Sequence, residues 1–199
     1  MKVYRLKHGP LGEFAVLRGT DEPGDTQMID GFWGKPMAAD WRKVRLTRRI
    51  ESAADASKPL ADYAQDVSFP LFGERSVAEL SEILRANGEL LATAFDEAKY
   101  WYYNPLTLLD ALDEKQAEFF GKSRQITRYV FKTQVISEAT IFKLSYWSKG
   151  NTIFVTDRFI ARVEASNLTG FEPLLVWSDE DDVIRRFDIF DLPIEASVE

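Results

Sequence analysis

The sequence has no cysteine and a single histidine, His8. Without cysteine the chain forms neither disulfides nor thiolate metal sites, a composition typical of a reducing compartment. One imidazole does not suffice for a two-histidine metal site or a zinc-protease motif, and no histidine-based triad is recognisable around it. We expect His8 to be a surface residue at the end of a strand.

Glycine-rich phosphate loops are also missing. The chain has no Gly-x-Gly and no complete Gly-x-x-x-x-Gly-Lys-Ser/Thr motif, the two patterns whose backbone N–H groups commonly cradle phosphates. Nucleotide binding by the common routes is therefore not expected, and the sequence indicates no cofactor.

Long apolar runs are absent as well. No stretch approaches the roughly 20 apolar residues that span a bilayer, and the first ten residues alternate basic and apolar side chains instead of forming a signal-peptide core. We place the protein in the cytoplasm and expect no membrane partner.

Charge is present but unevenly distributed. The net charge is -7, and residues 179–199 hold eight acidic residues against two arginines. This acidity argues against a nucleic-acid partner, because phosphate binding needs clustered cations. A basic run is the exception, and we interpret it as a solvated strand or loop: Arg42, Lys43, Arg45, Arg48 and Arg49.

Aromatic and β-branched residues are concentrated in residues 100–177, a composition that suits a pleated, half-buried surface. We predict an α+β fold with a mostly antiparallel sheet and two or three helices packed on one face. Residues 1–178 would form one domain, loop-rich over residues 1–64, and residues 179–199 an acidic C-terminal tail.

Several elements can be predicted individually. Residues 2–7 and 13–18 would form an opening hairpin, and residues 126–136 a strand. Ser76 as N-cap, with Glu79 three residues later, predicts a helix that ends at Gly88. Two runs flanking residues 148–151 predict a hairpin. A second helix would begin at Thr156 or Asp157, bury Phe159, Ile160 and Val163, and end before a strand at residues 174–177.

Carboxylates are the only reactive groups in quantity. Asp110 and Asp113 are three residues apart and could act as a pair in glycosidic or metal-assisted chemistry, but capping of a short turn is the favoured interpretation. The run Asp179, Glu180, Asp181 and Asp182 could hold Mg²⁺ with a substrate's phosphates, although such runs are common in acidic tails.

Trp101 and Tyr102 belong to a dense aromatic group, Tyr100-Trp101-Tyr102-Tyr103. Most of its members are expected in the core, but strand alternation turns every second side chain outward. Tryptophan and tyrosine dominate the hot spots of protein interfaces, so the exposed members are candidates for binding a partner.

Motifs between residues 31 and 177 resemble the immunity proteins of bacterial polymorphic toxin systems, in particular immunity family eleven. They occur in this order: Gly34-Lys35-Pro36, Trp41, the predicted Ser76 helix with Glu89-Leu90-Leu91, Tyr103-Asn104, Leu109-Asp110-Ala111-Leu112-Asp113, Ile141-Phe142-Lys143-Leu144, Val155-Thr156-Asp157, and Leu168-Thr169-Gly170-Phe171-Glu172-Pro173. The resemblance implies an α+β domain that protects the producing cell by binding a cognate toxin, and it implies no catalytic residues.

The residues themselves agree with a binding protein. An acidic chain suits a basic partner, for example a nuclease toxin, because complementary charge speeds association. The candidate toxin-binding residues are Asp179, Glu180, Asp181, Asp182, Trp101 and Tyr102. A carboxylate- or metal-dependent enzyme and a scaffold without a toxin partner remain the alternatives, and the sequence gives no indication of an oligomeric state.

Overall fold

The structure is a computed structural model that describes residues 1–9, 12–20, 32, 34–66, 69–123, 125–145, 152–188 and 192–198. It is an α+β fold in which nearly all strand pairs are antiparallel, as predicted. The first half contains β1 (Lys2–His8), β2 (Val16–Gly19), β3 (Leu46–Arg49), α2 (Ala53–Ser57), β4 (Tyr63–Asp66), β5 (Phe69–Gly73), α3 (Glu74–Glu79), α4 (Ser81–Asn87) and β6 (Gly88–Ala92). The second half contains β7 (Tyr100–Pro105), β8 (Leu108–Leu109), β9 (Glu118–Phe120), β10 (Gln125–Arg128), α5 (Thr133–Ile136), β11 (Ile141–Leu144), β12 (Phe154–Thr156), α6 (Asp157–Ala165), β13 (Phe171–Ser178), β14 (Val183–Phe187) and β15 (Pro193–Val198).

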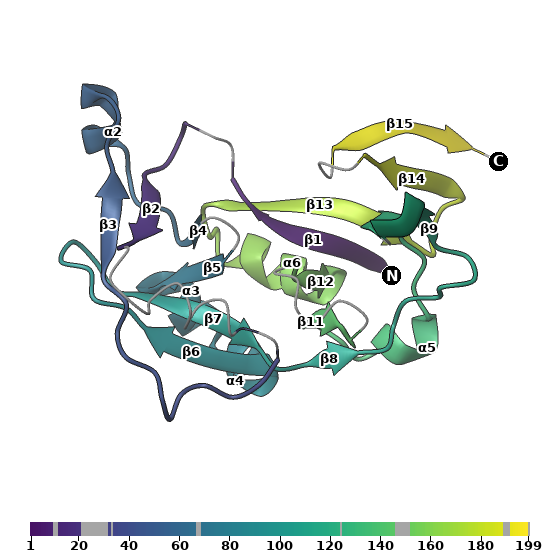
Figure 1. Ribbon diagram of the computed structural model, residues 1–199, viewed down its shortest axis with the longest axis horizontal. Helices are drawn as coiled ribbons and strands as arrows, with labels where there is room; N and C mark the ends of the chain where they lie inside the picture. Colours follow the sequence, from purple (N-terminus) through teal and green to yellow (C-terminus); the bar gives the residue numbers. More distant parts are fainter. Residues whose placement is uncertain are drawn as a thin grey trace.

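Two sheets form the body of the molecule (Figure 1). The first has the order β13-β1-β12-β11-β8, and the second has the order β4-β5-β7-β6. Three two-stranded ribbons complete the architecture: β2–β3, which projects from the body with α2 at its end, β9–β10, and β14–β15.

Three apolar cores hold these parts together. The central core takes side chains from both sheets and from α4 and α6, including Leu84, Phe159 and Tyr103. A second core joins the first sheet to the β9–β10 and β14–β15 ribbons, and a third joins the second sheet to β2 and β3. Each sheet is thus covered on both faces, which explains why strand residues here are apolar on both sides.

The predicted helix count and packing were wrong in detail. Five α-helices occur among the described residues, and they do not share one face: α2 lies on the projecting ribbon, whereas α4 and α6 contribute to the central core. The physical reason is that the apolar residues form two sheets, which leaves an interior between them for helices to fill.

The predicted opening hairpin was also wrong. β1 lies between β12 and β13, and β2 pairs with β3. Val3 and Leu6 are buried in two different cores, so β1 is a central strand and needs a partner on each edge.

The predicted capping box at Ser76 was wrong as well. The helix begins three residues earlier than a Ser76 N-cap predicts, at Glu74 with Gly73 as N-cap, so Ser76 lies inside its first turn. There the Ser76 hydroxyl donates to the carbonyl oxygens of Gly73 and Asp62. The helix breaks at Leu80 and resumes as α4, which ends at Asn87.

Other predicted elements were confirmed. β11 and β12 are antiparallel neighbours, although the loop between them falls largely outside the described residues. α6 has Thr156 as its N-cap and buries Phe159, Ile160 and Val163. The predicted strand at 174–177 lies within β13.

Only the first part of the predicted strand at 126–136 is extended, because the chain turns after Arg128 and forms α5.

Residues 179–199 are not a free acidic tail. They contain β14 and β15, and Phe187 is buried in the second core beside Tyr129, whose ring lies 6.0 Å away between centroids. None of the helices in the described ranges is long and apolar enough to cross a membrane.

Candidate partner-binding surface

The acidic turn, residues 179–182, connects β13 to β14. Asp179 and Glu180 accept hydrogen bonds from the Met1 ammonium at 2.5 and 2.6 Å, and Lys2 Nζ lies 3.2 Å from Glu180. The hydrogen bonds to Asp179 and Glu180 raise the pKa of the Met1 amino group. These two predicted partner-binding carboxylates are therefore engaged in fastening β1 to the turn.

Asp181 also forms hydrogen bonds within the protein. Both of its carboxylate oxygens accept from the Arg185 guanidinium, at 2.8 and 2.9 Å, and Oδ1 also accepts from the Val183 N–H. The Arg185 hydrogen bond is the main reason why the pKa of Asp181 falls to about 2. This carboxylate shapes the start of β14.

Asp182 differs from its three neighbours. It is exposed, and it forms no hydrogen bond or ion pair with any described residue. Together with Asp181 it borders a polar cleft of about 350 Å³. The other residues around the cleft come from β10, β13, β14 and the turn before β9, among them Gln116, Arg128, Trp177 and Arg185.

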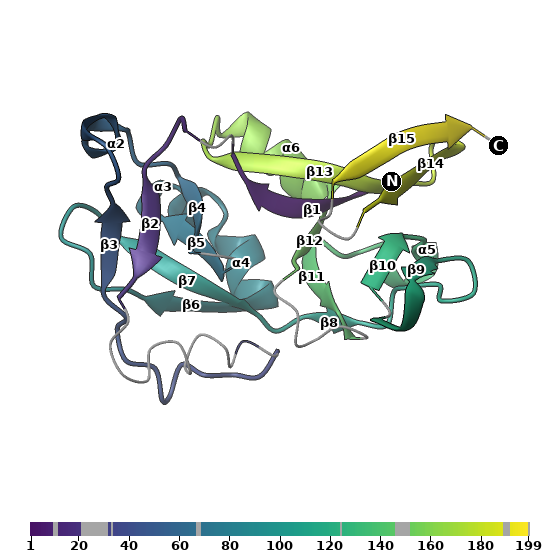
Figure 2. The same ribbon diagram turned by 45° about the horizontal axis from the view of Figure 1, so that its top comes forward.

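The two ribbons around the cleft are joined to each other. Arg186 of β14 donates two hydrogen bonds to Glu118 of β9, at 2.7 and 2.8 Å, and Arg128 of β10 approaches the same carboxylate at 3.4 Å. The Arg186 hydrogen bonds lower the pKa of Glu118. β9, β10, β14 and β15 thus form one unit, here called the C-terminal lobe (Figure 2).

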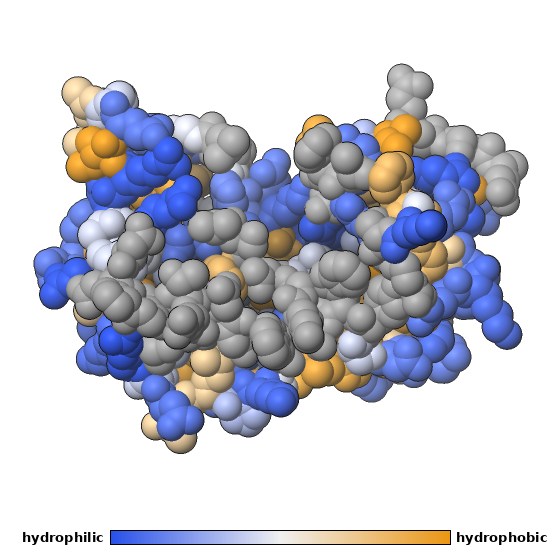
Figure 3. All heavy atoms as spheres, in the orientation of Figure 1, coloured by the Kyte–Doolittle hydropathy of each residue, from blue (hydrophilic) through white to orange (hydrophobic). Residues whose placement is uncertain are grey.

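Exposed apolar side chains are concentrated on this lobe. Phe120, Leu192 and Ile194 are 55%, 58% and 50% exposed. Figure 3 shows apolar atoms over the β14–β15 ribbon, separated by a hollow from the projecting β2–β3 ribbon. These three residues are not among the binding residues predicted from the sequence. Leu192 and Ile194 lie between the acidic residues Asp191 and Glu195, which is the signal that could have identified them.

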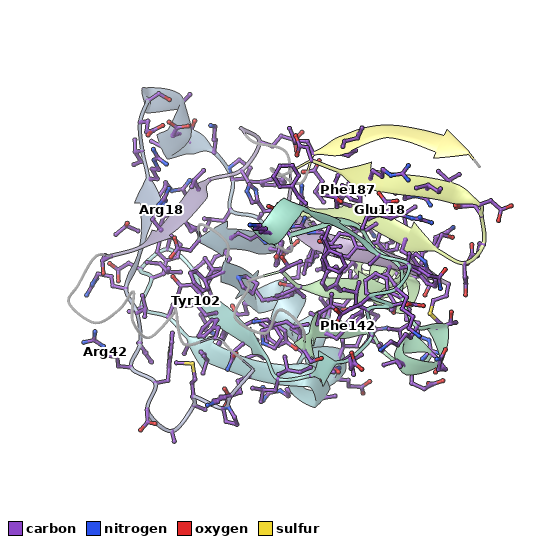
Figure 4. All side chains as sticks on the ribbon, turned by 45° about the vertical axis from the view of Figure 1, so that its right-hand side comes forward. Arg18, Arg42, Tyr102, Glu118, Phe142 and Phe187 are labelled. Carbon is purple, nitrogen blue, oxygen red and sulfur yellow. The ribbon has the colours of Figure 1, made fainter. Side chains whose placement is uncertain are left out.

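Tyr102 must be removed from the candidate surface. It is completely buried on β7, its hydroxyl donates to Asp66 at 2.6 Å, and its ring packs against Phe32 and Trp41 (Figure 4). Trp101 is partly exposed on the same strand. It lies in the second sheet, whereas the acidic turn follows a strand of the first sheet, so the structure does not join the two predicted groups.

Asp110 and Asp113 each interact with a different set of neighbours. Asp110 lies 3.0 Å from Lys132 Nζ, and Asp113 accepts from the Lys115 N–H and the Gln116 amide at the start of a turn. Within the described ranges, no group of three or more His, Cys, Asp or Glu residues could hold a metal ion.

Residues 92–176 match the model of the immunity protein family Imm11. This match confirms, over that segment, the resemblance found in the sequence. The segment runs from the end of β6 into β13 and includes Phe120, whereas the acidic turn, Leu192 and Ile194 lie beyond it. No curated protein matches the chain.

Proposed function

We propose, from the match of residues 92–176 to an immunity protein family, that the protein neutralises a cognate toxin by stoichiometric binding in the cytoplasm of the bacterium that produces the toxin. In this proposal it acts as an inhibitor and not as an enzyme. The family match is the observation that carries the proposal.

The C-terminal lobe is the proposed toxin-binding surface. Interfaces combine apolar anchors with polar groups that set orientation, and this lobe exposes Phe120, Leu192 and Ile194 and also carries the exposed carboxylate of Asp182 before β14. The acidic side chain favours a basic partner, such as a nuclease toxin, by electrostatic complementarity.

A co-expression experiment tests the function. The product of a neighbouring toxin-like gene should kill the host when expressed alone, should be harmless when this protein is co-expressed, and should purify with it in a fixed ratio. Killing that persists despite co-expression of a folded immunity protein would overturn the proposal.

A paired substitution tests the surface. Leu192→Asp should weaken toxin binding by about tenfold or more, because an apolar anchor in an interface commonly contributes that much. Ile50→Asp is the matched control, since Ile50 is similarly exposed, at 57%, but directly follows β3, which lies at the opposite end of the molecule from β14 and β15 (Figure 1). Both variants should keep the wild-type unfolding midpoint. Equal affinities of the two variants would exclude Leu192 from the interface while leaving the toxin-neutralising function testable by co-expression.

The enzyme alternative has a separate test. No observation on the described residues favours it, because Asp110, Asp113 and Asp181 are each engaged by neighbouring groups. A tight Mg²⁺ or Mn²⁺ site would raise the unfolding temperature with metal concentration by mass action, and we expect no such rise.

A further inference from the structure

A second cavity lies on the opposite side of the molecule from the C-terminal lobe. It is formed where the end of β1, the ribbon strand β2, β4 and the start of β13 meet, and its volume is about 220 Å³. The residues that line it include Gly9, Gly170, Tyr63 and Gln65.

Backbone segments approach each other closely beside the cavity. The Gly9 N–H donates to the Gly170 carbonyl at 2.7 Å, and a Cβ on Gly170 would lie 2.1 Å from the Tyr63 carbonyl oxygen. Gln65 Nε2 donates to the Tyr63 hydroxyl at 3.0 Å. Burial raises the pKa of Tyr63, so its phenol stays protonated and retains a hydrogen to donate.

The charged residues around the cavity are all basic. Arg18 from β2 and Arg49 from β3 line it together with His8, and none of the described lining residues is an aspartate or glutamate. In a chain with a net charge of -7 this is a local reversal of sign. One of these residues, Arg49, belongs to the basic run at residues 42–49, which has no role in the proposed toxin binding.

The two arginines differ in whether they form an ion pair with a described residue. Arg49 is paired with Glu51. The Arg18 guanidinium, which projects from β2 in Figure 4, has no hydrogen bond or ion pair to any described residue. A guanidinium at a cavity presents a planar set of donors that fits an oxyanion in a bidentate manner.

We propose that this cavity binds a small molecule through a phosphate or carboxylate group, with Arg18 as the principal anion-binding residue and Arg49 in support. The volume is below the range of roughly 300–1,000 Å³ typical of drug-sized ligands, so the ligand is a compact anion and not a dinucleotide. Gln65, which is only half-buried, provides a neutral hydrogen-bonding group for the rest of the ligand. The inference is independent of toxin binding, because it uses neither the C-terminal lobe nor the acidic turn.

Calorimetric titration of the full chain at low ionic strength tests the site. Inorganic phosphate and succinate are titrated separately, and the probe that binds more tightly shows whether the site prefers a phosphate or a carboxylate group. At least one probe should bind saturably and raise the unfolding temperature. Arg18→Gln should lower the affinity about tenfold, as expected for the loss of hydrogen bonds to a charged group, and Arg49→Gln should lower it less.

Arg45→Gln is the matched control. Arg45 immediately precedes β3, its side chain is 54% exposed, and it does not line the cavity. This variant should bind the probe like the wild type. Absence of saturable binding of both probes would overturn the proposal, and so would equal affinities of the Arg18→Gln and Arg45→Gln variants.

Discussion

Lys143 shows how one side chain can make stability depend on pH. It is buried on β11, and its ammonium donates to the Phe32 carbonyl at 2.7 Å. Desolvation lowers its pKa to about 8. Because the unfolded chain holds this proton up to about pH 10.5, the unfolded state binds more protons between pH 8 and 10.5, and the contribution of Lys143 to stability rises over that window.

Lys143→Met should therefore be more stable than the wild type at pH 7, by about 1 kcal/mol after loss of the Phe32 hydrogen bond. Its advantage should shrink as the pH rises from 8 to 10, since the wild-type ammonium loses its proton there. Urea unfolding at each pH measures the difference. Lys99→Met, at a side chain 69% exposed, is the control and should give a difference that does not change with pH; a constant advantage of Lys143→Met would contradict the assignment.

Gly170 allows β4 and β13 to approach each other. Its φ is +84°, and an added Cβ would strike the Tyr63 backbone at 2.1 Å. Gly170→Ala should lower the free energy of unfolding by about 3 kcal/mol, from the left-handed backbone and from overpacking together. Gly12→Ala is the control, because Gly12 has a φ of +103° with no atom within 4 Å, and should cost about 1 kcal/mol. Equal losses in chemical denaturation would show that the contact has no effect.

At the scale of elements, the sequence predicts those helices and strand pairs that depend on residues close together in the chain. The cap and apolar stripe of α6 and the β11–β12 pairing depend on residues close together in the chain. The partner of β1 could not be found in this way, because β13 lies some 170 residues further on. The hydrogen bond from Met1 to Asp179 could not be predicted for the same reason, because the two residues are far apart in the sequence. Strand alternation alone also could not predict that Tyr102 faces the third core.

The Glu118–Arg186 pair fastens β9 to β14 and belongs to this scale. Glu118→Gln should lower the free energy of unfolding by about 1 kcal/mol at pH 7, a magnitude suited to a bidentate but partly exposed pair. Because the native pKa lies below the usual 4.5, the stabilisation is present above about pH 4.5 and is lost as the pH falls through the native pKa.

Unfolding of the two proteins at pH 7 and pH 3 measures this effect, and their difference should be smaller at pH 3. Glu138→Gln removes a more exposed partner of Arg158, with a side chain 87% exposed, and should destabilise the protein less than Glu118→Gln does. A loss from Glu118→Gln that persists unchanged at pH 3 would contradict an electrostatic origin.

At the scale of the whole molecule, the net charge of -7 should speed association with the basic toxin that we propose as the partner. Asp182→Lys should slow association with the neutralised toxin and weaken its dependence on salt, while leaving the free energy of unfolding unchanged, since Asp182 has no described partner to lose. Stopped-flow mixing at several ionic strengths measures both effects. Asp96→Lys, at a side chain 96% exposed and beyond β6, is the control for charge alone; identical rates for the two variants would show that only the total charge matters.

The position of β1 between β12 and β13 has a consequence for biosynthesis. β1 has no partner on either edge until residues 154–178, which follow it at a long distance in the sequence, have been translated. Contacts between such distant segments slow folding. Under the proposed function, a chain could therefore bind its partner only after nearly the whole of this sequence has been synthesised and has folded.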